Sequence, residues 1–177
     1  MVNNKINISA FKEQPPAHVG ERRLYLNGPV YPTEKILEIL DAGDNHTRLW
    51  TRKCIRDIAN LTLEMDEVRL LIRQAVTLGT YVNSEWCVQK PDGPCAACDG
   101  YRLYRDEWIA YAKKTICFEY YVKFAITRNE KSCCWFPVIH RSRGTIMNKQ
   151  LCPICESGFL HSEYERVEAE HQESKAT

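Results

Sequence analysis

The sequence predicts an α+β fold in which helices come first and an antiparallel β-sheet follows. Apolar residues recur at helical spacing in the first half of the chain, whereas the second half holds segments rich in aromatic and β-branched residues around a polar turn. With 177 residues, of which 44% are hydrophobic and 27% charged, the chain can bury one core plus a small appendage.

The first part of the chain is predicted to be an arm of turns. Prolines at Pro15 and Pro16, Gly20 and the turn Asn27-Gly28-Pro29 interrupt any helical period. A short strand is expected over residues 23–26.

Three helices are predicted next. The first covers residues 32–42 and ends at Gly43. The second begins after Thr51, a typical N-cap, and runs to Leu61, and the third begins after Asp66 and ends before Gly79. Their apolar stripes consist of Ile36, Leu37 and Leu40, then Cys54, Ile55, Ile58 and Leu61, then Val68, Leu71, Ile72 and Ala75.

The sheet is predicted from the later segments. Residues 118–126 and 133–140 are expected to form a β-hairpin around the polar turn 127–132. Pro137 cannot donate a ladder hydrogen bond, so the second strand is expected at an edge or with a bulge. Residues 82–108 are expected to form one or two strands around the loop that runs from Lys90 to Cys95.

The charge is unevenly distributed along the chain. The net charge is only +1, yet residues 101–149 hold ten basic and four acidic residues, and the tail from Glu163 to Lys175 holds five Glu against two basic residues. A basic body with an acidic end is compatible with a polyanionic partner or with a solvated face.

Membrane insertion and secretion are not expected. No apolar run approaches the roughly 18 residues that a membrane helix needs, and the first residues lack the apolar region of a signal peptide. The chain is therefore expected to be cytoplasmic, and its nine cysteines are expected to be reduced.

Two Cys-x-x-Cys pairs predict a structural zinc site. Cys95 and Cys98 precede Asp99-Gly100, and Cys152 and Cys155 are followed by Gly158. This spacing lets both thiolates of a pair reach one ion, so the four thiolates predict one closed tetrahedral site. A different partner for either pair, or redox chemistry of one pair, are the alternatives. The other residues considered as ligands are Cys87, Cys133, Cys134, His140 and His161.

Several segments together resemble a known family. They are residues 31–43, 51–63 and 65–72, the Tyr-x-Lys pattern of residues 121–124, and residues 138–141. In this order they resemble MqsR-type toxins, which are small RelE-like α+β ribonucleases of bacterial toxin–antitoxin systems. The resemblance covers roughly Tyr31 to Arg141.

The resemblance implies an organisation and partners. It implies a toxin-like domain over residues 31–145. The arm over residues 1–30, the zinc-binding loop insertion near 90–100 and the zinc knuckle with an acidic tail over 146–177 are additions to the family pattern. The segment Cys152–Gly158 is similar to the knuckle of the family's antitoxins. The implied partners are mRNA and a protein antitoxin or regulator.

The resemblance also implies an endoribonuclease of the mRNA interferase type. Cleavage of single-stranded RNA without metal requires a base for the 2′-hydroxyl, cations for the phosphate and an acid for the leaving oxygen. The implied catalytic residues are Lys123, Tyr121, His140, Arg141 and Arg105. Because side chains alternate along a strand, Tyr121 and Lys123 are expected to share a face that only one of His140 and Arg141 can join.

The sequence departs from the family at two catalytic positions. The family carries a catalytic lysine in a Tyr-Lys-Ser stretch, which is replaced here by Tyr81-Val82-Asn83-Ser84, and its glutamine corresponds to Arg105. The missing lysine, together with the predicted four-thiolate zinc site, motivates an alternative function. The alternative is a zinc-stabilised, non-catalytic protein that binds a protein or a nucleic acid.

Overall fold

A computed structural model describes residues 6–16, 22–90, 93–129 and 133–135. The chain divides into two compact units. The first comprises Met1–Leu103 and Glu119–Arg141, and the second comprises Tyr104–Phe118 and Ser142–Thr177. Only residues 104–118 of the second unit are described; they hold the end of one long strand, a short turn and the start of the next strand, and all other described residues belong to the first unit.

The described elements confirm the α+β class. In chain order they are β1 (Arg23–Leu24), α1 (Thr33–Asp41), β2 (Thr47–Leu49), α2 (Arg52–Leu61), α3 (Met65–Thr77), β3 (Thr80–Val88), β4 (Cys95–Ile109), β5 (Lys114–Ile126) and β6 (Cys133–Trp135). Short 3-10 helices lie at Asp44–His46 and Ala110–Ala112. None of the α-helices in the described ranges has the length and apolarity to cross a bilayer.

The strands form one mainly antiparallel sheet in the order β1-β3-β4-β5-β6-β2. The hairpin predicted between β5 and β6 is confirmed by the pairing of Phe124 with Trp135. The short strand β2 was not predicted, and it pairs in parallel with β6. The edge alternative is therefore wrong over Cys133–Trp135, because this strand lies between β5 and β2. The bulge alternative stays a prediction, since Pro137 lies outside the described residues.

The predicted helices are confirmed, with one cap misplaced. The hydroxyl of Thr51 accepts a hydrogen bond from the backbone N–H of Cys54 at 3.1 Å, as expected of an N-cap. The third helix starts at Met65 after Glu64, and the carboxylate of Glu67 accepts from the N–H of Glu64 at 2.8 Å. The Glu64 side chain in turn accepts from the backbone N–H of Glu67, which completes a capping box. The predicted cap at Asp66 is thus wrong, because the helix begins earlier, after Glu64.

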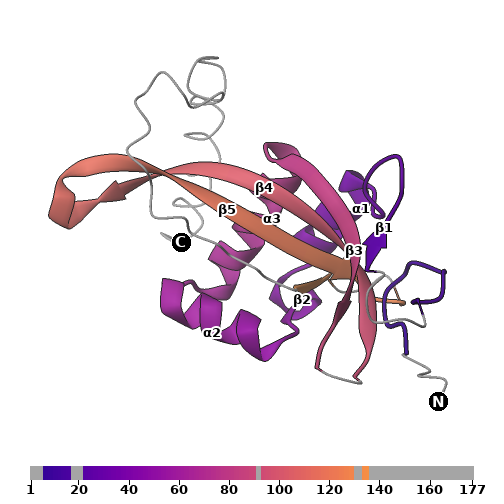
Figure 1. Cartoon of the computed structure of the whole chain (residues 1–177). Helices are drawn as coiled ribbons and strands as arrows, with labels where there is room; N and C mark the ends of the chain where they lie inside the picture. The colour runs from indigo at the N-terminus through magenta and orange to yellow at the C-terminus, as the bar shows by residue number, and fades with distance from the viewer. Residues whose placement is uncertain (1–5, 17–21, 91–92, 130–132, 136–177) are drawn as a thin grey trace. The chain divides into compact units, whose positions relative to one another are not determined.

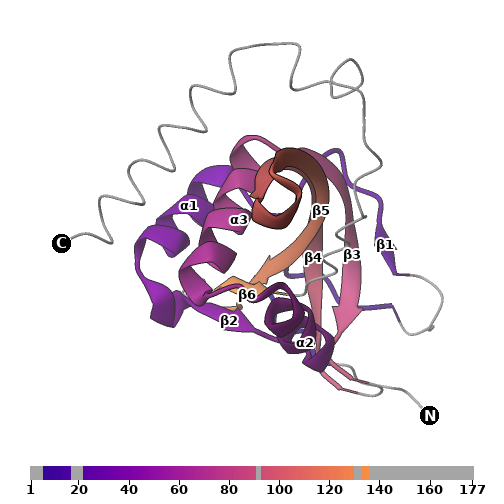
Figure 2. The same cartoon turned by 90° about the vertical axis from the view of Figure 1, so that its left-hand side faces the viewer.

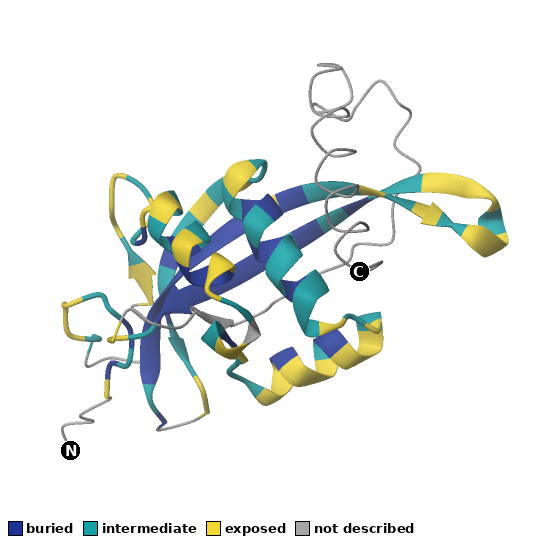
Figure 3. Cartoon of the chain, turned by 180° about the vertical axis from the view of Figure 1, so that it is seen from behind, coloured by how far each residue is buried: buried dark blue, intermediate teal, exposed yellow. Residues whose placement is uncertain are grey.

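The helices α1 and α3 cover one face of the β3–β4–β5 sheet (Figure 1, Figure 2). The main core lies in this interface, and in Figure 3 the central strands and parts of the helices are coloured as buried. The ring of Tyr101 on β4 stacks on Phe124 of β5 with centroids 5.7 Å apart. Helix residues that close the core include Ile36, Leu40, Leu71 and Ile72, all fully buried.

The N-terminal arm contains an additional element of the sheet. The N–H of Ile8 donates to the carbonyl of Cys95, and the N–H of Cys95 donates to the carbonyl of Ile6, both at 2.9 Å. On its other side the segment bonds to the end of β5, where Ala10 donates to Ile126 at 2.9 Å. Residues 6–10 are therefore inserted between the start of β4 and the end of β5.

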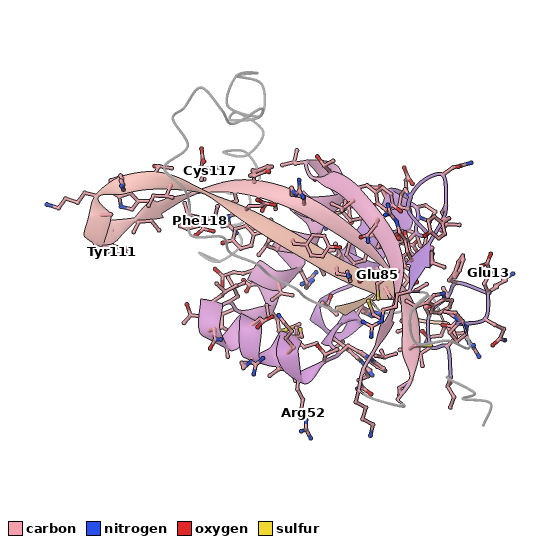
Figure 4. The ribbon with its side chains drawn as sticks, in the orientation of Figure 1. Glu13, Arg52, Glu85, Tyr111, Cys117 and Phe118 are labelled. Atoms are coloured by element: carbon pink, nitrogen blue, oxygen red, sulfur yellow. The ribbon has the colours of Figure 1, made fainter. Side chains whose placement is uncertain are left out.

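The second unit is described only at the far end of the β4–β5 hairpin. Its turn at Ala110–Ala112 ends at Lys113, which has a φ of 47°. Trp108 is 64% exposed and Tyr111 is 92% exposed, and Figure 4 shows Tyr111 at the turn.

Candidate active site on the sheet face

Polar side chains from three strands gather on one face of the sheet. We call them the polar cluster, which consists of Asn83, Glu85 and Cys87 on β3, Cys98 on β4, and Tyr121 and Lys123 on β5. Glu85 is paired with Cys98, and Asn83 with Gly100, in the ladder between β3 and β4. Because side chains alternate, this face is opposite to the one that carries the core residues Tyr101 and Phe124. Figure 4 places Glu85 in this part of the sheet.

Lys123 forms an ion pair at the centre of the cluster. Its Nζ contacts Oε1 of Glu85, and the Lys123 residue is only 5% exposed. Burial lowers the pKa of Lys123, but the charges of Cys87 and Glu85 outweigh burial, so this pKa lies above its ordinary value. Lys123 is therefore an ammonium ion at neutral pH.

Tyr121 lies beside Lys123, as predicted from strand alternation. The Nζ of Lys123 is 5.3 Å from the centroid of the Tyr121 ring. The hydroxyl of Tyr121 donates to Oδ1 of Asn83 at 2.9 Å. Burial raises the pKa of Tyr121, so the phenol stays protonated and can act as a donor.

Gly100 makes room for this tyrosine. A Cβ atom at Gly100 would lie 2.3 Å from Oη of Tyr121 and 3.0 Å from Oδ1 of Asn83. Any side chain at this position would displace the hydroxyl from Asn83. The tyrosine of β5 thus reaches β3 by crossing the backbone of β4 at a residue without a side chain.

The two thiols of the cluster lie on adjacent strands, and each donates to a backbone carbonyl: Cys87 to Glu85 at 3.8 Å and Cys98 to Ala96 at 3.5 Å. The neighbouring Cys98 and the charge of Lys123 lower the pKa of Cys87, although burial acts in the opposite direction. Burial raises the pKa of the Cys98 thiol. The pKa values of these two neighbouring thiols are therefore shifted in opposite directions.

The predicted turn of the first Cys-x-x-Cys pair is not formed. Cys95 and Cys98 lie in the strand β4, where they pair with Val88 and Glu85. Residues three apart in a strand point to opposite faces, so these two thiols cannot reach one ion while β4 keeps this form. The predicted knuckle turn at Cys95–Cys98 is thus wrong, whereas the role of these two residues as zinc ligands stays a prediction.

The zinc site itself stays a prediction, because Cys152 and Cys155 lie outside the described residues. Across the part of the chain that the structure describes, no three side chains of His, Cys, Asp or Glu converge as a metal site.

The remaining predicted catalytic residues are not part of the described cluster. His140 and Arg141 lie outside the described residues. Arg105 belongs to the second unit, where its Nε is 4.0 Å from Oε1 of Glu107.

Sequence reasoning missed the two acceptors of the cluster, Glu85 and Asn83. Their signal is the alternation of Asn83, Glu85 and Cys87 along a strand, which indicates one polar face. The alternation does not reveal that this face meets Lys123, because that depends on the register of β3 against β4 and on the order of the strands.

Chemically, the cluster combines a carboxylate, an ammonium group and a protonated phenol on one face. Comparisons with protein-family models, with characterised proteins and with solved structures find no match to the chain. The likeness to MqsR-type toxins therefore rests on the sequence pattern, and functional reasoning starts from the cluster.

Proposed function

We propose that the polar cluster is the active site of a metal-independent ribonuclease with a RelE-like fold. The observation that supports this proposal is the contact of Lys123 with Glu85 beside Tyr121 on one sheet face. These groups match the base, the cation and the acid that cleavage at a 2′-hydroxyl requires.

Each group has a distinct role in the proposed reaction. Glu85 is the base that takes the proton of the 2′-hydroxyl. Lys123 balances the charge that builds up on the scissile phosphate, and its buried position makes that interaction stronger than in water. Tyr121, whose raised pKa keeps it protonated, donates to the leaving 5′-oxygen.

The proposed substrate is single-stranded mRNA, and the proposed protein partner is an antitoxin or regulator. The excess of basic residues between Tyr101 and Lys149 supports an RNA substrate through attraction to phosphates. A protein that covers this basic region would control access to it.

Long single-stranded RNA incubated with the protein in EDTA tests the proposal. We expect the wild type to cleave it, and Glu85→Gln and Lys123→Ala to lose about 10²–10⁴-fold in rate, the usual contribution of a general base or acid. Lys35→Ala is the matched control, because Lys35 also pairs with a carboxylate, Glu38 at 3.1 Å, but lies on α1. It should retain full activity.

The test also needs a control for folding, because Lys123→Ala leaves a half-buried carboxylate without its partner. The double variant Glu85→Gln/Lys123→Met removes both charges and should unfold close to the wild-type temperature while remaining inactive. An inactive wild type, or equal cleavage by wild type and Lys123→Ala, would contradict the proposal.

One observation favours a second candidate, a binding protein without catalysis. Lys123 is almost completely buried and its charge is already matched by Glu85, which suits a group that stabilises the sheet rather than one that receives a phosphate. A specific protein or nucleic-acid partner in a pull-down, together with no RNA cleavage, would support this candidate. Clear ribonuclease activity without any specific partner would exclude it.

A further inference from the structure

The turn of the β4–β5 hairpin exposes two aromatic rings that the proposed cleavage chemistry does not use. Trp108 lies near the end of β4, and Tyr111 lies in the short 3-10 turn that leads to β5. Trp108 is 64% exposed, Tyr111 is 92% exposed, and this end of the hairpin is coloured largely as exposed in Figure 3. Single exposed apolar residues are common, but aromatic rings carry more apolar surface than other side chains, so two of them at one turn indicate a surface that contacts a partner.

The backbone holds both rings outward. Along the end of β4, Asp106 and Trp108 are exposed, whereas Glu107 is half-buried, as expected of side chains that alternate along a strand. Tyr111 follows in a tight turn that is closed by Lys113 with a left-handed φ of 47°. The rings therefore stand on a strand end and a tight turn, which fixes their backbone positions before any partner binds.

Positive charge lies at the same turn. Lys113 and Lys114 are both exposed, and neither forms an ion pair within the described ranges of the chain. Of the two acidic residues nearby, Glu107 has Oε1 of its carboxylate 4.0 Å from Nε of Arg105, while Asp106 is exposed. The turn itself thus carries two lysines and no acidic residue.

Exposed rings beside cations suit single-stranded nucleic acid better than other partners. Unpaired bases stack on aromatic rings, and the phosphates of the strand are attracted to lysines. A stable protein interface buries about 800 Å² on each partner, which two side chains of one turn do not supply. A lipid surface is disfavoured as well, because even one myristoyl chain binds membranes only marginally and both rings carry polar N–H or O–H groups.

We propose that this hairpin turn is a binding surface for single-stranded RNA. Trp108 and Tyr111 each stack on an unpaired base, and Lys113 and Lys114 contact phosphates of the same strand. Every base has a face that can stack, so binding has little sequence preference. That RNA, and not DNA, is the ligand rests on the proposed function.

Fluorescence anisotropy with a labelled 2′-O-methyl oligoribonucleotide tests the proposal, since this probe lacks the 2′-hydroxyl that the proposed cleavage needs. We expect the full chain to bind it, and Trp108→Ala and Tyr111→Ala each to weaken binding about 5–150-fold. Trp108→Phe keeps a ring and should recover most of the affinity. Lys113→Gln should lower the slope of log affinity against log salt concentration by about 0.7, the value for one phosphate contact of a single strand.

Tyr25→Ala is the matched control. Tyr25 is 89% exposed, like the rings of the turn, but it follows β1, and the guanidinium of Arg23 is 5.9 Å from the centroid of its ring. This variant should bind the probe as tightly as the wild type. Because all the substituted side chains are exposed, each variant should unfold close to the wild-type temperature, which thermal unfolding measures.

A wild type that does not bind the probe would overturn the proposal, and so would equal affinities of the wild type and Trp108→Ala. Trp108-dependent binding to vesicles of phosphatidylcholine and phosphatidylserine, with RNA binding unaffected by the substitution, would overturn it in favour of a lipid surface. The proposed ribonuclease fails separately. A chain that binds the probe through Trp108 but does not cleave unmodified RNA contradicts the cleavage and supports the binding surface.

Discussion

At the scale of single residues, the polar cluster depends on Gly100, which has no side chain, as much as on the polar side chains themselves. The hydroxyl of Tyr121 reaches Asn83 only because Gly100, which lies between them on β4, has no side chain. A glycine inside a strand weakens it, since it loses more chain entropy on folding and packs nothing. Gly100 therefore costs some stability and allows the contact between β5 and β3 in return.

Gly100→Ala is expected to destabilise the protein by about 1–3 kcal/mol, which is typical of an inserted methyl group in a packed site. The new Cβ would lie 2.3 Å from Oη of Tyr121, so the ring must move and its hydrogen bond to Asn83 must break. Urea denaturation of both chains measures the change. Gly28→Ala is the control, since a Cβ at Gly28 meets nothing within 4 Å.

A double-mutant cycle shows whether the clash with Tyr121 is the cause. In a Tyr121→Ala background the ring is absent, so Gly100→Ala should cost much less than in the wild type. An equal cost in both backgrounds would mean that the strand backbone, and not Tyr121, requires glycine at this position.

The pH dependence of stability is expected to show the burial of Cys54. This thiol on α2 is completely buried, and burial raises its pKa from 9.0 to about 12. Since the pKa is higher in the folded state, the thiol's contribution is fully present below pH 9 and is lost as the pH rises from 9 towards 12.

We expect the wild type to lose up to about 1.4 kcal/mol of unfolding free energy per pH unit in this range relative to Cys54→Ala, which has no thiol to ionise. Denaturation of both chains at pH values on either side of 9 measures the difference. Parallel pH profiles of the two chains would contradict the assignment of this loss to Cys54.

At the scale of elements, the inserted segment 6–10 connects the ends of two strands. It bonds to β4 through Ile6 and Ile8, and to β5 through Ala10 and through the carbonyl of Ile8, which accepts from Arg128 at 2.7 Å. The hydroxyl of Ser9 also accepts from the N–H of Ala97 at 3.1 Å. Without this segment, backbone groups at the ends of both strands would lose their partners.

Removing residues 1–10 is expected to lower the unfolding free energy by on the order of 3 kcal/mol, because several backbone hydrogen bonds of about 0.5–1.5 kcal/mol each are lost. Hydrogen exchange should accelerate at the amides of Ala97 and Arg128. Removing only residues 1–5 keeps all of these bonds and is the control. Equal protection of both amides in the two truncated chains would contradict the role of the segment.

The elements also show which parts of the fold local sequence can predict. The helix that starts after Thr51 was predicted because its cap and its stripe are local signals. The three residues of β2 were missed because so short a strand carries no period, and its parallel pairing with β6 depends on a distant segment.

The first Cys-x-x-Cys pair shows where a local pattern misleads. The spacing of Cys95 and Cys98, followed by a glycine, is typical of a metal-binding turn. Pairing of this segment with Glu85–Val88 across the sheet makes it a strand instead. The glycine then serves the packing of Tyr121, which the sequence pattern alone does not reveal.

At the scale of the whole molecule, the basic residues between Tyr101 and Lys149 can interact with a charged partner only where acidic residues of the same chain do not already pair with them. Within the basic segment, Arg102 pairs with Glu119 at 2.8 Å, and Lys123 pairs with Glu85. The segment from Tyr101 to Lys149 has six more basic than acidic residues; the pair of Arg102 with Glu119 lies within this count, and the pair of Lys123 with Glu85 lowers the excess to five. The acidic tail carries charge of the opposite sign on the same chain, so under the proposed function it would compete with RNA for this region.

Deleting Ser162–Thr177 is expected to strengthen binding of single-stranded RNA. The deletion removes five acidic and two basic residues, which raises the net charge of the chain from +1 to +4. Fluorescence anisotropy with a labelled oligoribonucleotide at several salt concentrations measures the effect, which should be largest at low salt because the attraction is screened.

A tail in which the five glutamates are replaced by glutamine is the matched control for length. It should bind RNA as tightly as the truncated chain if charge is the cause. RNA affinity that is unchanged in both variants would show that the tail does not shield the basic region, and the excess charge of the body would then be open to a partner at all times.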